Sequence, residues 1–211
     1  MRRLPAALAA VLLALGAPAL RADTPGAFDY WVLALSWSPS WCAAEGGPDA
    51  PQCAPERDLG FVVHGLWPQY EEGWPEWCRS SERDPSRRRT AAMADVMGSG
   101  GLAWRQWRKH GRCSGLSAAD YFALTRRARA RVRVPAALRA LGRPVRIDAA
   151  VIAAAFLEAN PGLAADGVTV TCRDGRFAEA RICFDRALRF RPCAPDAARD
   201  CRGMTRLTPP P

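Results

Sequence analysis

The stretch from Val168 to Phe184 reads VTVTCRDGRFAEARICF and indicates the fold class most directly. Its two apolar runs, 168–172 and 177–184, alternate with polar residues, as strands with one buried face do. Asp174 and Gly175 lie between the runs and are typical of the tight turn of a β-hairpin. The sequence therefore predicts two antiparallel strands in the C-terminal third of the chain.

Two further strands are predicted near the N-terminal end. FDYWVLALSW, residues 28–37, is rich in aromatic and branched side chains and ends at Ser38-Pro39, which favours a buried strand. LGFVVHG, residues 59–65, predicts another strand with His64 near its end. We expect the chain to turn away at Leu66-Trp67-Pro68.

Helical patterns fill the middle of the chain. One helix is predicted over 87–97, and a second over 102–112, with a break at Gly111. The second helix would carry Leu102, Trp104 and Trp107 on its apolar side.

Two more helices begin at good N-cap residues. Ser117 is followed three residues later by Asp120, and Asp148 precedes AAVIAAAFLEA, which ends at Asn160-Pro161-Gly162. Strands at both ends with helices between them predict an α+β domain, with a central antiparallel sheet and helices packed around it.

The composition is that of one folded domain. The chain has 211 residues, 49% of them hydrophobic and 24% charged, which excludes a disordered or low-complexity protein. No linker divides it, so we expect a single domain over 23–211, with 205–211 as a disordered tail. The formal charge of +9 favours acidic partners, and Lys109 is the only lysine.

The first residues are typical of a secretory signal peptide. Arg2 and Arg3 precede an apolar run over 4–15 that is too short to span a membrane, so no membrane anchor is expected. We predict a signal peptide over 1–22, with cleavage after Ala22, or alternatively after Ala19. The mature protein would then be exported to the periplasm or the extracellular space.

The cysteines also favour an exported protein. Their number is eight, and none forms the paired CxxC spacing of a zinc ribbon. We therefore expect disulfides, each contributing roughly 2–4 kcal/mol to stability. Eight cysteines allow 105 pairings, and the residues alone do not choose among them.

Two segments carry the candidate chemistry, and each holds one of the two histidines. FVVHGLWP, residues 61–68, contains His64, and WRQWRKHGRC, residues 104–113, contains His110. On a helix, Gln106, Lys109 and His110 would share one face. Two imidazoles can divide general base and general acid work, while a lysine and an amide stabilise an anionic transition state.

RNA cleavage by transesterification needs all of these groups. A 2′-hydroxyl must lose a proton, a phosphorane must be stabilised and a 5′-oxygen must gain a proton, whereas DNA lacks the nucleophile. The plainer alternatives are that both histidines are structural, that Trp67 belongs to the core, and that the arginines over 126–133 form a solvated helix face. A metal site has the least support, because two histidines without acidic or thiol neighbours supply too few ligands.

FVVHGLWP and QWRKHGRC resemble the two active-site signatures of the ribonuclease T2 family, in the expected order and separation. Residues 28–42 and 168–185 resemble the opening strand and the late hairpin of that family, so the likeness covers about 28–201. It implies a secreted endoribonuclease that needs no metal or other cofactor and cleaves single-stranded RNA through a 2′,3′-cyclic phosphate with low base specificity.

The resemblance also implies roles for individual residues. His110 would be the general base, His64 the general acid, and Lys109 the residue that stabilises the phosphorane. Trp67 would stack on a base. The implied disulfides are Cys42–Cys53, Cys78–Cys113, Cys172–Cys201 and Cys183–Cys193, of which Cys78–Cys113 would hold the end of the catalytic helix.

This chain departs from the family pattern at three positions. Gln106 replaces a glutamate of the second signature, Arg105 replaces a histidine, and Gln69 replaces an aspartate found in many fungal members. Gln106 can still form a hydrogen bond, and Arg105 can bind phosphate. We expect a monomer that takes RNA and not DNA as its substrate. Its alternatives are a catalytically weak or silent RNA-binding protein on the same fold and a secreted, disulfide-stapled interaction protein.

Overall fold

The computed structural model describes residues 23–47 and 49–210, so the predicted signal peptide over 1–22 lies outside the described residues. Within these two ranges, six strands form one sheet, in the order β2-β1-β5-β6-β3, and β4 pairs with β5 as well. Because β1 and β4 pair with the same residues of β5, they lie on its two opposite edges. The strands are β1 (Tyr30–Trp37), β2 (Phe61–Gln69), β3 (Val145–Asp148), β4 (Val168–Arg173), β5 (Arg176–Phe184) and β6 (Met204–Leu207).

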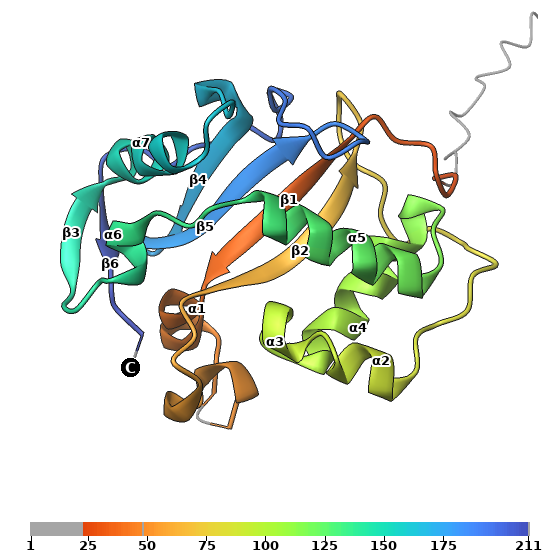
Figure 1. Cartoon of the computed structure of the whole chain (residues 1–211), viewed down its shortest axis with the longest axis horizontal. Helices are drawn as coiled ribbons and strands as arrows, with labels where there is room; N and C mark the ends of the chain where they lie inside the picture. Colours follow the sequence, from red (N-terminus) through yellow and green to blue (C-terminus); the bar gives the residue numbers. More distant parts are fainter. Residues whose placement is uncertain (1–22, 48, 211) are drawn as a thin grey trace, which may run out of the picture.

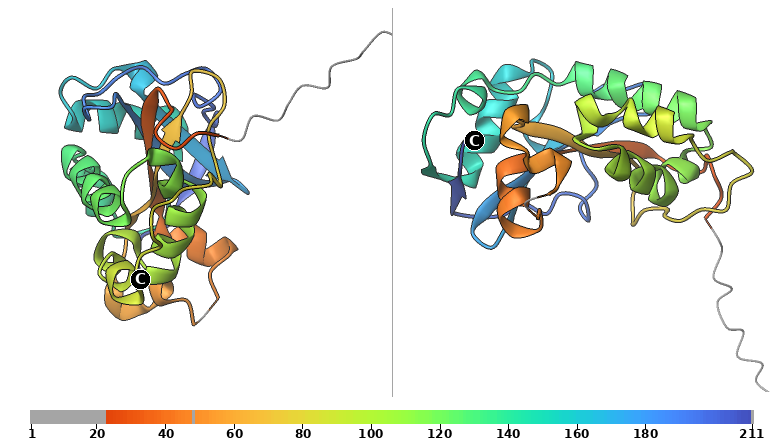
Figure 2. Two further views of the ribbon diagram at one scale, coloured as in Figure 1. Left: turned by 90° about the vertical axis from the view of Figure 1, so that its right-hand side faces the viewer. Right: turned by 90° about the horizontal axis from the view of Figure 1, so that it is seen from below.

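Seven α-helices of the described residues surround this sheet, which confirms the predicted α+β class. Figure 1 shows α2 to α5 gathered at the end of the sheet that holds β1 and β2, and α6 and α7 at the end that holds β3 and β6. Two further views show the same separation (Figure 2). The helices are α1 (Ser38–Ala44), α2 (Arg87–Ala91), α3 (Ala94–Met97), α4 (Gly100–Lys109), α5 (Ala118–Arg131), α6 (Ala136–Arg139) and α7 (Ala149–Ala159). None of the helices in the described residues is long and apolar enough to cross a membrane.

The predicted hairpin is confirmed as β4 and β5. Asp174 and Gly175 connect the two strands, with φ angles of 49° and 69°. Two consecutive positive φ values give a turn whose twist matches that of the paired strands, and Asp-Gly adopts them at little cost. The helix starts at Ser117 and Asp148 are also confirmed, since their side-chain oxygens accept hydrogen bonds from Asp120 N and Ala150 N.

Three predictions were wrong in their details. The helix expected over 87–97 is broken into α2 and α3. The strand predicted over 59–65 starts at Phe61 and continues to Gln69, because Tyr30 to Val32 of β1 pair with residues 67–69. Residues 205–207 of the expected disordered tail belong to β6, which pairs with β3 and buries Leu207.

The apolar face of α4 also differs from the prediction. Trp107 is buried, but Trp104 lies at the surface, where the guanidinium of Arg108 lies 5.9 Å from the centre of its ring. An exposed indole can be covered by a neighbouring cation at little cost, so helical spacing alone did not assign Trp104 correctly.

The two faces of β1 separate the main core from the face that carries the candidate site. Leu33, Leu35 and Trp37 point into the main core with the helices. Tyr30 and Val32 point to the other face, into a small cluster with Cys183 that Trp67 packs against. Further along that face, β1 presents only the small residues Ala34 and Ser36, which leaves room above the strand. The disulfides are Cys42–Cys53, Cys78–Cys113, Cys172–Cys201 and Cys183–Cys193, the pairing that the resemblance implies.

Candidate active site

His64 lies at a β-bulge in β2. Ala34 of β1 pairs with Gly65 and the next residue, Leu35, pairs with Val63, so His64 is the extra residue of the bulged strand. A bulge re-aims a side chain and is common beside active sites. It turns the imidazole of His64 away from the main core, and about a third of the side chain is exposed (37%).

Glu179 of β5 binds the imidazole of His64. The Nδ1 of His64 lies 2.6 Å from Oε1 of Glu179, and Arg181 donates to the other carboxylate oxygen at 2.9 Å. An ionised carboxylate can only accept, so Nδ1 carries the proton and Nε2 is left for chemistry. Burial alone would raise the pKa of Glu179, but the hydrogen bond from His64 and the charges of His64 and Arg181 outweigh it and lower that pKa to about 2.

Glu179 was not found by the sequence analysis. It too follows a bulge: Thr171 pairs with Glu179 and Cys172 with Phe177, so Ala178 is the extra residue. The bulge sends Phe177 into the core and Glu179 to the opposite face. One signal was available, since Glu179 is the only acidic residue in the apolar run over 177–184. A carboxylate in such a strand needs a partner.

Trp67 lies between the two histidines. Its ring centre is 5.2 Å from that of His64 and 5.3 Å from that of His110. The indole Nε1 donates to Oε1 of Gln106 at 2.8 Å, which connects β2 to α4. The guanidinium of Arg181 lies 5.2 Å from the Trp67 ring centre. These contacts fix the indole, and through it the separation of the imidazoles.

Gly65 is required for this contact. A Cβ at this position would lie 2.1 Å from Nε1 of Trp67 and 2.3 Å from Oε1 of Gln106, far closer than van der Waals contact. The absence of a side chain at Gly65 therefore allows α4 to approach β2 and lets Gln106 reach the indole.

His110 follows the last residue of α4 and is buried, with 6% of its surface exposed. Its Nδ1 is buried and has no hydrogen-bond partner among the described residues. Burial, together with the positive charges of Lys109 and His64, lowers the pKa of His110 to about 3. The imidazole is therefore neutral at and well below neutral pH, which is the form that a general base needs.

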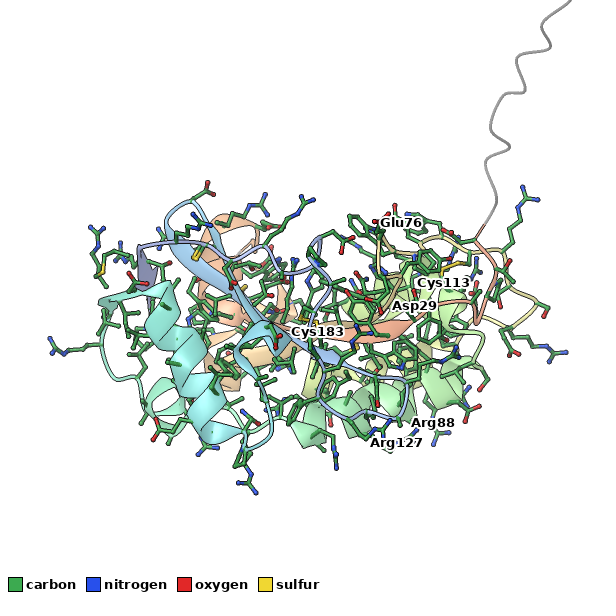
Figure 3. All side chains as sticks on the ribbon, turned by 90° about the horizontal axis from the view of Figure 1, so that it is seen from above. Asp29, Glu76, Arg88, Cys113, Arg127 and Cys183 are labelled. Atoms are coloured by element: carbon green, nitrogen blue, oxygen red, sulfur yellow. A yellow bond between two sulfur atoms is a disulfide. The ribbon has the colours of Figure 1, made fainter. Side chains whose placement is uncertain are left out.

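Lys109 lies at the end of α4 and is ion-paired. Its Nζ lies 3.1 Å from Oε2 of Glu76, and both side chains are more than a third exposed. The backbone N–H of Trp77 donates to the carbonyl of Lys109, and the Cys78–Cys113 disulfide joins the same two segments. Figure 3 shows Glu76 and Cys113 at one end of the molecule. The loop after β2 is thus fastened to the end of α4.

A cavity of about 620 Å³ opens beside His64. The sheet contributes Glu179, Arg173 and Arg181 to its lining, and α4 contributes Arg105. Of these three arginines, Arg173 and Arg181 are ion-paired with Glu45 and Glu179, which also line the cavity, and Arg105 forms no ion pair within the described residues. In the part of the chain that the structure describes, no group of three or more His, Cys, Asp or Glu side chains is placed to hold a metal ion.

The structure thus brings five predicted residues to one region. Gln106 and His110 both contact Trp67, His64 contacts it from the other side, and Lys109 is adjacent to His110. Arg105 instead lines the cavity beside His64. The arginines over 126–133 belong elsewhere: Arg126 of α5 is ion-paired with Asp95.

The comparisons with known proteins assign this fold and these two histidine motifs to one protein family. The ribonuclease T2 family model matches residues 28–193, and this chain belongs to that family. A ribonuclease from Aeromonas hydrophila is 46% identical over 99 residues, which is 47% of this chain and 44% of that protein. A probable ribonuclease from Haemophilus influenzae is 35% identical over 108 residues, covering 45% and 40% of the two chains.

The likeness to solved structures concerns the fold. An RNase-related protein from Calystegia sepium superposes with a TM-score of 0.69 at 20% identity, covering 87% of this chain and 98% of that one. The matches to the two bacterial relatives span less than half of each relative's length.

Proposed function

We propose that this protein is an endoribonuclease that cleaves single-stranded RNA by transesterification and needs no metal ion. The observation that carries the proposal is the pair of imidazoles on the two sides of Trp67. One of them is held neutral by burial, and the other has its Nδ1 proton bound to a carboxylate. One ring can take a proton while the other gives one.

His110 starts the reaction as the general base. It accepts the proton of an RNA 2′-hydroxyl, and the 2′-oxygen attacks the adjacent phosphorus. A neutral imidazole with a pKa of about 3 is a weak base, and the approach of an anionic phosphate would make it a stronger one. The requirement for a 2′-hydroxyl means that DNA is not cleaved.

His64 completes the reaction as the general acid. The bond from phosphorus to the 5′-oxygen breaks, and Nε2 of His64 gives that oxygen a proton. The products are a 2′,3′-cyclic phosphate and a free 5′-hydroxyl. Glu179 is a positioning residue: its Oε1 accepts the hydrogen bond from Nδ1 of His64 and so fixes the ring, which leaves Nε2 for the proton transfer.

Lys109 and Gln106 stabilise the phosphorane that forms between these two steps. The ammonium of Lys109 leaves the carboxylate of Glu76 and binds the phosphate. A dianionic phosphorane attracts the ammonium more strongly than one exposed carboxylate does. Gln106 holds Trp67, and its amide nitrogen is left as a donor. Arg105 binds phosphate from the cavity wall.

We further propose low base specificity. Gln69 occupies the position of a base-contacting aspartate, but it is buried and its amide donates to the carbonyl of Pro68. It is therefore not available to a base. The protein would act as an exported monomer, in keeping with its disulfides.

The test is to incubate the oxidised mature chain with a short RNA and with its DNA equivalent, in EDTA, over pH 4 to 8. We expect a 2′,3′-cyclic phosphate from the RNA alone. His64→Ala and His110→Ala should each lower kcat by about 10²–10⁴-fold with an unchanged far-UV spectrum. Undiminished cleavage by both folded variants would show that the assignment is wrong.

A catalytically weak RNA-binding protein is the second candidate. The absence of a carboxylate at Gln106 and the ion pair between Lys109 and Glu76 favour it. It predicts RNA binding by folded protein without any cyclic product.

A further inference from the structure

Four arginines form a row across four adjacent strands. Arg173 of β4 pairs with Arg176 of β5, Arg176 pairs with Arg206 of β6, and Arg206 pairs with Arg146 of β3. Paired residues of neighbouring strands project from the same face of a sheet. We call these four residues the arginine row.

The row lies on the face of the sheet that carries the cavity. Phe177, next to Arg176, is in the main core, and so is Leu207, next to Arg206. Side chains alternate along a strand, so both arginines point away from that core. Arg146 and Arg206 are exposed and line a shallow depression with Gly175.

Most of the row carries uncompensated charge. Arg173 is ion-paired with Glu45, but Arg146, Arg176 and Arg206 form no ion pair within the described residues. The carboxylate of Asp148, two residues after Arg146, accepts a hydrogen bond from the backbone N–H of Ala150 and so caps α7. Like charges placed opposite each other in a sheet repel, and an anion lying across them would relieve this repulsion.

The row starts at the candidate active site. Arg173, its first member, lines the same cavity as His64 and Glu179. His64 serves the leaving 5′-oxygen, which belongs to the nucleotide on the 3′ side of the cut. A strand that leaves the site on the 3′ side through this cavity would reach Arg173, which lines it.

We propose that the arginine row is a binding site for the RNA backbone on the 3′ side of the cleaved bond. The inference rests on the proposed function and extends it, because it gives the enzyme a preference for long substrates. Strands are about 4.8 Å apart, so the row is about 14 Å long, which suits successive phosphates of an extended strand. Arginine is suited to phosphate because its planar group donates two parallel hydrogen bonds.

The experiment compares substrates that differ only in where they are extended. Each is a 2′-deoxy strand with one ribonucleotide, so that it has one cleavable bond, and it is extended by four deoxynucleotides on the 3′ or the 5′ side. The variant is Arg146→Gln/Arg176→Gln/Arg206→Gln. We expect its kcat/KM for the 3′-extended substrate to fall at least tenfold relative to that for a dinucleotide, and the 5′-extended substrate to show no such change.

A matched control removes the same charge elsewhere. Arg88, Arg127 and Arg131 are exposed residues of α2 and α5, and Figure 3 shows the first two on the helical side of the molecule. Arg88→Gln/Arg127→Gln/Arg131→Gln should leave the length preference intact. An equal loss in both triple variants, or a loss with the 5′ extension, would overturn the proposal.

Binding separates this proposal from the proposed function. A 2′-O-methyl RNA of twelve nucleotides cannot be cleaved by this route, and its affinity can be measured by fluorescence anisotropy. The row variant should bind it at least tenfold more weakly, and the slope of log affinity against log salt should become shallower by about 0.7 for each phosphate that it no longer binds. This result stands even if no RNA is cleaved. Unchanged RNA affinity, together with weaker binding to anionic lipid vesicles, would assign the surface to a membrane and contradict the proposal.

Discussion

The imidazole of His64 and the carboxylate of Glu179 meet at 2.6 Å although they are separated by 115 residues of sequence. They come from strands on opposite sides of β1 and reach over it, where β1 presents only Ala34 and Ser36. Each of the two strands has a bulge at this level. Two bulges and two small residues thus produce one hydrogen bond, and this bond occupies Nδ1 and leaves Nε2 as the histidine nitrogen without a carboxylate partner.

The variant Glu179→Gln should separate two effects of Glu179, the orientation of the His64 ring and the negative charge beside it. The glutamine oxygen can still accept from Nδ1 of His64, but the negative charge beside the ring is lost. We expect kcat to fall by about 10–100-fold while the ring keeps its orientation. The measurement is kcat against pH with a dinucleotide substrate.

Glu179→Ala is the companion variant, because it also removes the acceptor and leaves Arg181 without its ion-pair partner. It should be slower than Glu179→Gln at every pH. A merely structural role of Glu179 would lower stability in both variants and leave kcat of the folded protein unchanged.

The variant Gln106→Glu should alter the general-base step of the reaction. A carboxylate here can still accept from Trp67, and its negative charge near His110 would make that imidazole a stronger base. We expect the acid limb of kcat/KM to move to higher pH and the rate near neutral pH to rise. An acid limb identical to that of the parent chain would show that Gln106 does not influence His110.

Gly65→Ala should disturb the site through the backbone. The added Cβ would lie 2.1 Å from Trp67 and 2.3 Å from Gln106, so the indole and α4 must move apart. We expect a loss of about 1–3 kcal/mol in the free energy of unfolding and at least a tenfold loss of kcat/KM. Urea unfolding and RNA cleavage measure the two effects.

Gly142→Ala is its control, because a Cβ at that position would have no neighbour within 4 Å. It should leave activity unchanged and alter stability by less than about 1 kcal/mol. Equal behaviour of the two variants would contradict the close approach of α4 and β2.

His110 should make the protein sensitive to mild acid. Its pKa is about 3 in the folded chain and 6.5 when unperturbed, so below pH 6.5 the unfolded chain binds more protons. The free energy of unfolding then falls by up to about 1.4 kcal/mol per pH unit down to the folded pKa. The pKa of Glu179 is lowered from 4.5 to about 2, which adds a loss in the same direction only below about pH 4.5.

The interval from pH 4.5 to 6.5 therefore isolates His110. Urea unfolding at pH 6 and pH 5 should give a smaller difference for His110→Gln than for the parent chain, by about 1 kcal/mol. Parallel pH dependences of the two proteins would show that the imidazole is not protected from protonation in the folded state.

Local signals in the sequence predicted the fold well. The turn at Asp174-Gly175 and the caps at Ser117 and Asp148 depend on neighbouring residues, and each was found where it was expected. The extension of β2 through Trp67 and the strand β6 depend on pairing with distant segments, so no local pattern could indicate them.

The residues of the candidate site also divide into those that a local motif indicates and those that depend on distant segments. His64, His110 and Lys109 lie in two short motifs and were found from the sequence. Glu179 was missed because its role comes from a bulge and from a strand pairing that the sequence does not state. The ion pair of Lys109 with Glu76 was missed for a similar reason, since it depends on the path of the loop after β2.

The Cys78–Cys113 disulfide joins the loop after β2 to the end of α4 only once it has formed. Cys113 lies three residues after His110, and Cys78 closes the loop that carries Glu76. While both thiols remain reduced, as they would in the compartment where the chain is synthesised, that loop and the end of α4 are not joined. A freshly made chain would then be a poor nuclease toward the transcripts and ribosomes of its own cell, and oxidation would serve as its maturation step.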